Sequence, residues 1–107
     1  MFQLRICTLR SRAALRQYAT VHWARHLTTF KAFGVTTHAV WTERSGGANR
    51  LAELIRCPPD ADPEQLTGDY MDSPECVADM GGFDPKNKNI IDVESLLLDP
   101  TSFSPIH

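Results

Sequence analysis

The order in which strand-like and helix-like segments follow one another restricts the fold of this chain most. Residues 1–9 alternate between apolar and polar positions, as a half-buried strand does, and residues 11–33 space their apolar positions like a long helix. Two further strands, 35–43 and 49–57, flank the turn-forming Ser45-Gly46-Gly47 and form a hairpin. Two short helices and a last strand, 90–98, complete the order β-α-β-β-α-β, with the second helix split in two. This order predicts an α+β, ferredoxin-like domain: a four-stranded antiparallel sheet with helices on one face.

Residues that begin and end helices mark these boundaries. Ser11 is placed to cap the long helix, and Gly34 accepts the left-handed backbone that ends one. Asp62 and Ser73 each precede a proline, which suits the first helical position, and Gln65 is placed to complete a capping box. We expect the second short helix to end at Gly81-Gly82.

The remaining segments set the extent of the domain. We expect a loop over 83–89 and one domain over 1–107, in which 99–107 is a C-terminal tail. The strand 90–98 is apolar enough to be central in the sheet or buried on both faces. This strand and the strand that carries Trp41 have apolar residues on both faces, so the face of the sheet without helices needs a cover. A second copy of the sheet is the simplest cover, which predicts a homodimer.

The charges are unevenly distributed. Residues 1–42 contain six basic residues and no acid, whereas 43–107 contain all thirteen acids and the other five basic residues. We expect a basic first helix to pack beside an acidic second one; the alternative is a pocket mouth that attracts anions. The spread of the basic residues and the net charge of −2 argue against nucleic-acid binding. No apolar run approaches the ~20 residues of a membrane helix, and a first segment that alternates like a strand argues against a removable leader.

The long helix carries two histidines where aliphatic residues would be expected. Its apolar stripe consists of Leu15, Ala19, His22, His26, Phe30 and Phe33, with Tyr18 and Trp23 beside it. As core residues, the two imidazoles need hydrogen-bond partners; as pocket residues, they can exchange protons near neutral pH. Tyr18, one turn before His22, and the adjacent Arg25 favour the pocket.

Metal and cofactor signals are weak. His22 and His26 have the spacing of two ligands on one helix face, but the glutamate of HExxH is missing and no third ligand has a diagnostic spacing. Cys7, Cys57 and Cys76 are odd in number and have no metal or redox spacing, which indicates a reduced, cytoplasmic protein. We expect no metal and no cofactor.

Four more side chains complete the candidate site. Arg5 lies in an apolar strand and must reach an anionic ligand, solvent or a carboxylate, for which Glu53 and Glu94 are the internal candidates. Trp41 and Trp23 can form an aromatic wall or belong to the core. We therefore predict His22, His26 and Tyr18 as acid–base residues, with Arg5, Arg25, Trp23 and Trp41 as ligand-binding residues and no metal ligands.

Segments along nearly the whole chain resemble one family. FQLRICTLR, HWARH, FGVTTHAVWT, YMDSPECVADMGGFDP and VESLLLDP are similar to the corresponding segments of bacterial NIPSNAP-family proteins. That family belongs to the dimeric α/β-barrel superfamily, together with antibiotic-biosynthesis monooxygenases and EthD-like proteins. The resemblance implies the ferredoxin-like fold, two sheets paired into a barrel, and a cavity between the first helix and its own sheet. It implies no particular reaction and no catalytic residues.

The expected function is binding of a small apolar or aromatic molecule, which can carry an anionic end, in a pocket between the first helix and the sheet that is lined by Tyr18, His22, His26 and Trp41. Whether the molecule is only bound, or is also transformed by a cofactor-independent oxygenase, isomerase or cyclase reaction, stays open. The alternative is a non-enzymatic, homodimeric interaction protein without an open pocket.

Overall fold

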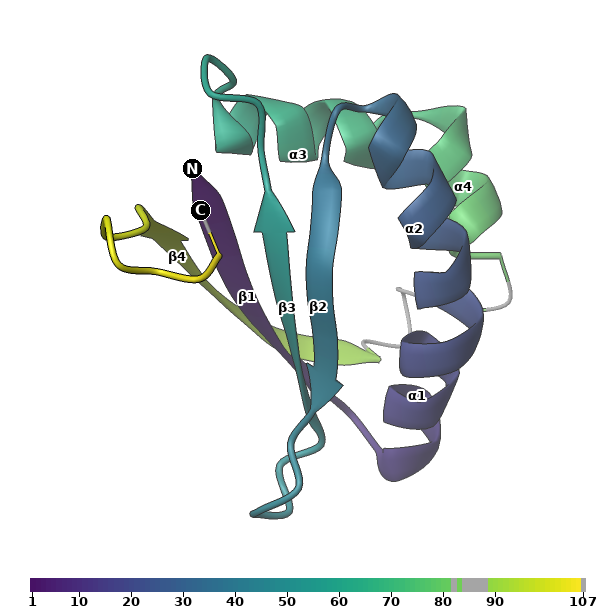
Figure 1. Cartoon of the computed structure of the whole chain (residues 1–107). Coiled ribbons are helices and arrows are strands. Elements are labelled where there is room, and N and C mark those ends of the chain that lie inside the picture. The colour runs from purple at the N-terminus through teal and green to yellow at the C-terminus, as the bar shows by residue number, and fades with distance from the viewer. Residues whose placement is uncertain (82, 84–88, 107) are drawn as a thin grey trace.

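A computed structural model describes residues 1–81, 83 and 89–106 of the chain. Four antiparallel strands form one sheet in the order β2-β3-β1-β4, with the helices on one of its faces (Figure 1). The predicted α+β, ferredoxin-like class is thereby confirmed. The strands are β1 (Phe2–Leu9), β2 (Thr36–Thr42), β3 (Arg50–Arg56) and β4 (Ile90–Leu98).

The long predicted helix is continuous but contains one π-helical turn. It consists of α1 (Arg12–Gln17), the π-turn η1 (Tyr18–His22) and α2 (Trp23–Ala32). Ser11 caps it as predicted, and Gly34 follows it with φ +79°. Trp23 is buried, and the five other buried residues, Ala14, Tyr18, His22, His26 and Phe30, are spaced by four, a spacing that drifts around an ideal α-helix of 3.6 residues per turn. The wider π-turn offsets part of this drift, so Tyr18 and His22 both face inward.

Two short helices form the second helical segment: α3 (Pro63–Met71) and α4 (Pro74–Asp79). The side chains of Asp62 and Ser73 cap them as predicted. The capping-box role of Gln65 is wrong, because its amide donates to Asp69 one turn later. The second helix ends two residues before the predicted Gly81, and the predicted loop over 83–89 lies outside the described residues except at its two ends. No helix in the described ranges has the length and hydrophobicity to cross a membrane.

The last strand occupies an edge of the sheet, so the prediction of a central or doubly buried β4 is wrong. β4 pairs only with β1, and Val93, Leu96 and Leu97 are about half exposed. The apolar run did not reveal the position of this strand in the sheet, because hydrophobicity alone does not show whether the apolar neighbours of a strand belong to the same chain.

The two faces of the sheet differ in an unexpected way. Phe2, Leu4 and Ile6 of β1 point away from the helices, whereas Gln3, Arg5 and Cys7 point toward them. Directly opposite neighbours in an antiparallel pair share a face, so Glu53 of β3 joins Arg5 on the helix side. The mixed face of β1 therefore lies in the interior, where it places charged side chains between the sheet and the helices.

Candidate functional site

Arg5 and Glu53 form an ion pair inside the domain. They are direct cross-strand neighbours on β1 and β3, and Arg5 Nη1 lies 3.2 Å from Glu53 Oε1. The Glu53 side chain is fully buried, while 21% of the Arg5 side chain is exposed. Internal pairing with Glu53, one of the predicted alternatives for Arg5, is thus present; Glu94 lies opposite Ile6 and faces the other side of the sheet.

Burial controls the charge state of this pair. Loss of solvent raises the pKa of Glu53 to about 7, although the nearby Arg5 guanidinium acts in the opposite direction. Burial is the largest influence on the pKa of Arg5 and lowers it, but the attractions of Glu53, Cys7 and Tyr18 together outweigh it, and the pKa of Arg5 lies above its usual value. Among the described residues, neither carboxylate oxygen of Glu53 has a hydrogen-bond partner of good geometry. Glu53 is therefore a buried carboxyl group that changes charge near neutral pH.

Two further titratable groups lie behind this pair and stay protonated. Burial, reinforced by the charge of Glu53, raises the pKa of the fully buried Cys7 thiol to about 11. The same two causes raise the pKa of the Tyr18 phenol. The Tyr18 ring stacks on Phe83 with ring centroids 5.5 Å apart, and its edge meets Trp23. Cys7 and Tyr18 therefore act as core residues at neutral pH.

The exposed side of Arg5 opens into a groove of about 650 Å³. Its floor comes from β1 and β4 and its wall from the beginning of α3. The lining residues are Gln3, Arg5, Asp62, Pro63, Glu64, Thr67, Val93, Ser95 and Leu97. A groove of this volume is in the range that small organic ligands occupy.

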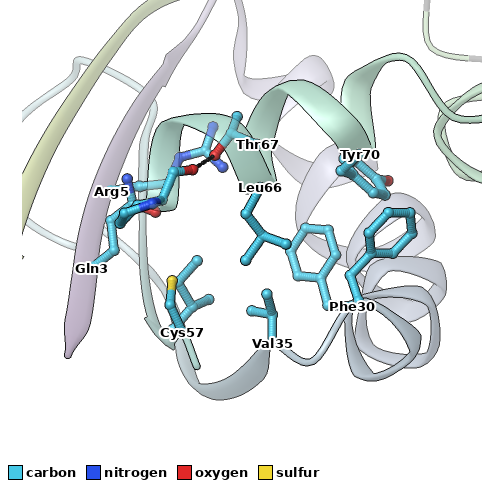
Figure 2. Close-up of a pocket in the computed structure, with 11 residues that line it drawn as sticks. Gln3, Arg5, Phe30, Val35, Cys57, Leu66, Thr67 and Tyr70 are labelled. Carbon is cyan, nitrogen blue, oxygen red and sulfur yellow. Dashed lines mark hydrogen bonds between the residues drawn. The ribbon is translucent and has the colours of Figure 1, made fainter. Parts of the chain in front are cut away.

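A small apolar cavity adjoins this groove. Figure 2 shows Arg5 and Gln3 on one side of it and Val35, Leu66 and Phe30 on the other. Its volume is about 40 Å³, which is room for one or two water molecules. Because Gln3 and Arg5 line both spaces, the groove and the cavity meet at the polar face of β1.

His22 is held in one orientation by two hydrogen bonds. Its Nδ1 lies 2.8 Å from the backbone carbonyl oxygen of Asp79, so Nδ1–H donates to it. The Gln17 side-chain amide donates to Nε2 over 3.2 Å. The side chain is fully buried. Its two nitrogens thus bind the end of α4 and the helix's own preceding turn.

His26 belongs to a polar cluster centred on Asp79. Tyr70 donates to Asp79 Oδ2 over 2.7 Å and lies 2.7 Å from His26 Nδ1, so that nitrogen carries the hydrogen and donates to the phenol oxygen. Thr29 donates to Asp79 Oδ1, and His26 Nδ1 lies 3.3 Å from Oδ2. Burial lowers the pKa of His26, and Asp79 opposes this effect. The cluster connects α2, α3 and α4.

The predicted site residues do not share one pocket. Trp41 lies opposite Ala52 on the face of the sheet away from the helices and is 57% exposed, so its predicted place beside Tyr18 and the histidines is wrong. The Arg25 guanidinium donates to the carbonyl groups of Asp79 and Gly81, where it satisfies the end of α4. Trp23 is buried, with its ring edge against Phe30 and His26. Of the predicted set, Arg5 alone lines the groove.

His38, whose side the sequence left open, also lies away from the helices. It is the extra residue at a bulge between Thr37 and Ala39, and its ring meets Phe2 with centroids 5.2 Å apart. A bulge shifts the side-chain alternation of a strand by one residue, which sequence periodicity cannot reveal.

The roles of Asp79 and Tyr70 in the polar cluster, and of Gln3 and Thr67 in the lining of the groove, were not predicted from the sequence. One signal pointed to Asp79: an acid in the last turn of a helix opposes the helix dipole, so a second role is expected for it. Nothing comparable marked Tyr70, Gln3 or Thr67, whose roles depend on the docking of α3. Within the described ranges, no group of three or more His, Cys, Asp or Glu side chains is arranged to hold a metal ion.

Comparison with solved structures places this fold among bacterial NIPSNAP proteins. A NIPSNAP family protein with unknown function from Agrobacterium tumefaciens superposes with a TM-score of 0.75 at 17% identity, over 99% of this chain and 92% of the other. A second NIPSNAP family protein from that organism has a TM-score of 0.70 at 17% identity, over 99% and 97% of the two chains. An uncharacterised NIPSNAP domain protein from Burkholderia xenovorans has a TM-score of 0.69 at 15% identity, over 98% and 99%.

These similarities establish a shared fold over the full length of the chain and carry no activity with them, since fold and function are separable. No protein-family model matches the sequence. No curated protein matches it either. The resemblance seen in the sequence is confirmed by the structures, at the level of the fold.

Proposed function

We propose that this protein binds a small organic molecule with one anionic end and an apolar body in the groove between α3 and the β1–β4 edge of the sheet. The observation that carries the proposal is the position of Arg5: Glu53 holds its guanidinium from the buried side, and its other side opens into the groove. A guanidinium held in this way pairs well with a carboxylate, because its orientation is set before the ligand arrives.

The charges around the groove favour a ligand with a single negative charge. Arg5 is the one basic residue among the described residues that line it, and Asp62 and Glu64 stand at the start of α3. These two carboxylates repel a ligand of high negative charge. A monocarboxylate therefore fits better than a phosphate or a dicarboxylate.

The apolar part of the ligand has two surfaces to contact. Val93 and Leu97 of β4 lie on the groove floor, and the small cavity lined by Phe30 and Leu66 extends behind Arg5. Val93, Leu97 and Leu66 all lie on the helix side of the sheet. Their burial by a ligand adds hydrophobic stabilisation to the ion pair that the ligand forms with Arg5.

The groove supports binding of this molecule and no reaction at the predicted acid–base residues. The predicted acid–base residues, His22, His26 and Tyr18, are absent from the residues that line the groove, and each is packed against other core groups. A reaction on the bound molecule would therefore have to rely on the polar side chains that line the groove and not on these three residues.

Calorimetric titration with decanoate, and with decanol as its uncharged counterpart, tests this proposal. We expect decanoate to bind and decanol to bind at least tenfold more weakly. Glu53→Gln keeps Arg5 and removes the competing carboxylate, so decanoate affinity should rise. Arg5→Gln combined with Glu53→Gln removes the pair without leaving a buried charge and should abolish the preference for decanoate. Equal binding of the two compounds by the wild-type protein, or an unchanged preference in the double variant, would refute it.

A second proposal concerns the face of the sheet away from the helices. We propose that two copies of the chain pair through it as a homodimer, because Trp41, Leu96 and Leu98 are 57%, 56% and 41% exposed there. Leu4, Ile6 and Leu54 belong to the same face. Contiguous apolar area of this kind is typical of an interface.

Analytical ultracentrifugation tests the dimer. We expect a dimer that Leu96→Lys converts to monomer, whereas Leu27→Lys, which changes another exposed leucine, on the outer side of α2, leaves it intact. A wild-type monomer at micromolar concentration would refute the proposal. We further propose a cytoplasmic location, which the three unpaired cysteines support; fractionation of cells that express the tagged full chain measures it.

A further inference from the structure

Figure 1 shows α1 and the loop that joins β2 to β3 at the end of the domain opposite α3. A second groove lies between these two elements. Its volume is about 460 Å³. The residues that line it are Arg12, Leu15, Arg16, Ala19, Thr20, Thr42, Glu43, Arg44, Gly46, Gly47 and Asn49. None of them lines the groove at Arg5, so the two sites are structurally independent.

Positive charge is concentrated at this second groove. Arg12 and Arg16 lie one turn apart on α1, and Arg44 reaches the groove from the β2–β3 loop. All three side chains are exposed, and among the ion pairs of the described residues none involves them. Glu43, the one acid among the described residues of the lining, is neutralised by Arg50. The groove is thus a concave surface with three uncompensated guanidinium groups, two of which, those of Arg12 and Arg16, belong to the acid-free segment 1–42.

A hydrogen-bond acceptor lies in the same groove. Glu43 binds Arg50 through Oε2, whereas Oε1 is buried and has no hydrogen-bond partner among the described residues. A Cβ atom at Gly46 would come within 2.9 Å of this oxygen, so a larger residue there would displace it. A buried acceptor without a donor is costly, and because 26% of the Glu43 side chain is exposed, a small shift of the Gly46 turn lets a hydroxyl group of a ligand satisfy this oxygen.

We propose that this groove binds a phosphate ester of a small hydroxyl-bearing molecule. Arg12, Arg16 and Arg44 contact the phosphate, because guanidinium groups pair with phosphate oxygens through short, charge-assisted hydrogen bonds. A hydroxyl group of the same molecule donates to Glu43 Oε1. The spread of the three arginines over one small concave groove suits a compact phosphate better than an extended polyanion.

Titration with ribose 5-phosphate, inorganic phosphate and ribose, at low and physiological salt, tests this site. We expect ribose 5-phosphate to bind more tightly than inorganic phosphate, and ribose not to bind. Arg16→Gln combined with Arg44→Gln should weaken ribose 5-phosphate binding at least tenfold. Lys31→Gln is the control for loss of basic charge, since Lys31 is exposed on α2 outside the groove, and it should leave binding unchanged.

A second variant separates the two parts of the site. Glu43→Ala removes the acceptor, so the preference for ribose 5-phosphate over inorganic phosphate should disappear while both anions still bind. Folding of each variant is checked by its near-ultraviolet circular dichroism. Equal weakening by the arginine double variant and by Lys31→Gln would show an adventitious ion only and would overturn the proposal. Binding to phosphatidic acid vesicles without binding to ribose 5-phosphate would overturn it in favour of a lipid headgroup.

Discussion

Replacement of the buried Glu53 by glutamine should remove one pH-dependent part of the folding free energy. In the folded protein the pKa of Glu53 is about 7, against 4.5 for the free side chain. Between these two values the folded state holds a proton that the unfolded state has released. Stability contributed by this group is therefore complete below pH 4.5, falls as the pH rises, and is lost above about pH 7.

The size of the effect follows from the same two values. The folded and unfolded pKa values differ by about 2.5. At about 1.4 kcal/mol for each pKa unit, this difference corresponds to roughly 3 kcal/mol of folding free energy. Glu53 has no exposed side-chain surface, so solvent screening does not reduce this figure. Glu53→Gln has nearly the same shape and keeps no titratable proton, so its stability should lack this component.

Urea denaturation at pH values from 5 to 8, at one fixed protein concentration, measures the effect. The wild-type free energy of unfolding minus that of Glu53→Gln should fall by about 2–3 kcal/mol across this range and level off near pH 7.5. Glu64→Gln, which changes an exposed glutamate at the rim of the groove, should leave the wild-type pH dependence intact. A constant difference between wild type and Glu53→Gln would show that Glu53 is ionised throughout and that the reasoning is wrong.

Three further predictions concern the Asp79 cluster, the glycine after the long helix, and the coupling between Glu53 and the groove. Asp79→Asn leaves the cluster between α2, α3 and α4 with too few acceptors and should destabilise the fold by about 2–4 kcal/mol in urea, whereas the exposed Asp72→Asn should cost less than about 0.5 kcal/mol. Gly34 has φ +79°, and a Cβ added there would lie 3.2 Å from a neighbouring atom, so Gly34→Ala should cost about 1 kcal/mol or more in the same assay. Gly47→Ala, with open space around the new Cβ, should cost almost nothing. Similar losses of stability in the two variants would contradict the role of backbone strain. An anion bound at Arg5 disfavours ionised Glu53, so decanoate should bind more tightly at pH 6 than at pH 8 by calorimetry, and the Glu53→Gln variant should show no such dependence.

The histidines of the long helix illustrate how a correct pattern can lead to a wrong site. Their burial was predicted from the helical stripe, and the structure confirms it. Their role was not determined by the helix, because an imidazole serves a core or a pocket according to what lies opposite its nitrogens. Here the backbone carbonyl of Asp79 accepts from His22, and the Tyr70 phenol oxygen, which itself donates to Asp79, accepts from His26. Arg25 of the same helix also donates to the end of α4.

Local sequence determined the elements of this protein and most of their limits. Alternation in β1, the caps at Ser11, Asp62 and Ser73, and the glycine at 34 each act within a few residues, so their effects can be worked out without the rest of the chain. The order of the elements then restricts the topology to a small number of folds, which is why the α+β class was predictable.

Only the tertiary structure decided which face of each strand meets the helices. Phe2, Leu4 and Ile6 would make a suitable core face, yet the polar neighbours Gln3 and Arg5 point inward. The choice depends on all four strands and on the docking of α3 at once, and it cannot be made from one strand. Because the side-chain period of a strand is two residues, the choice of face decides the position of every side chain on it. It placed Trp41 outside, Glu53 inside and Arg5 at the groove.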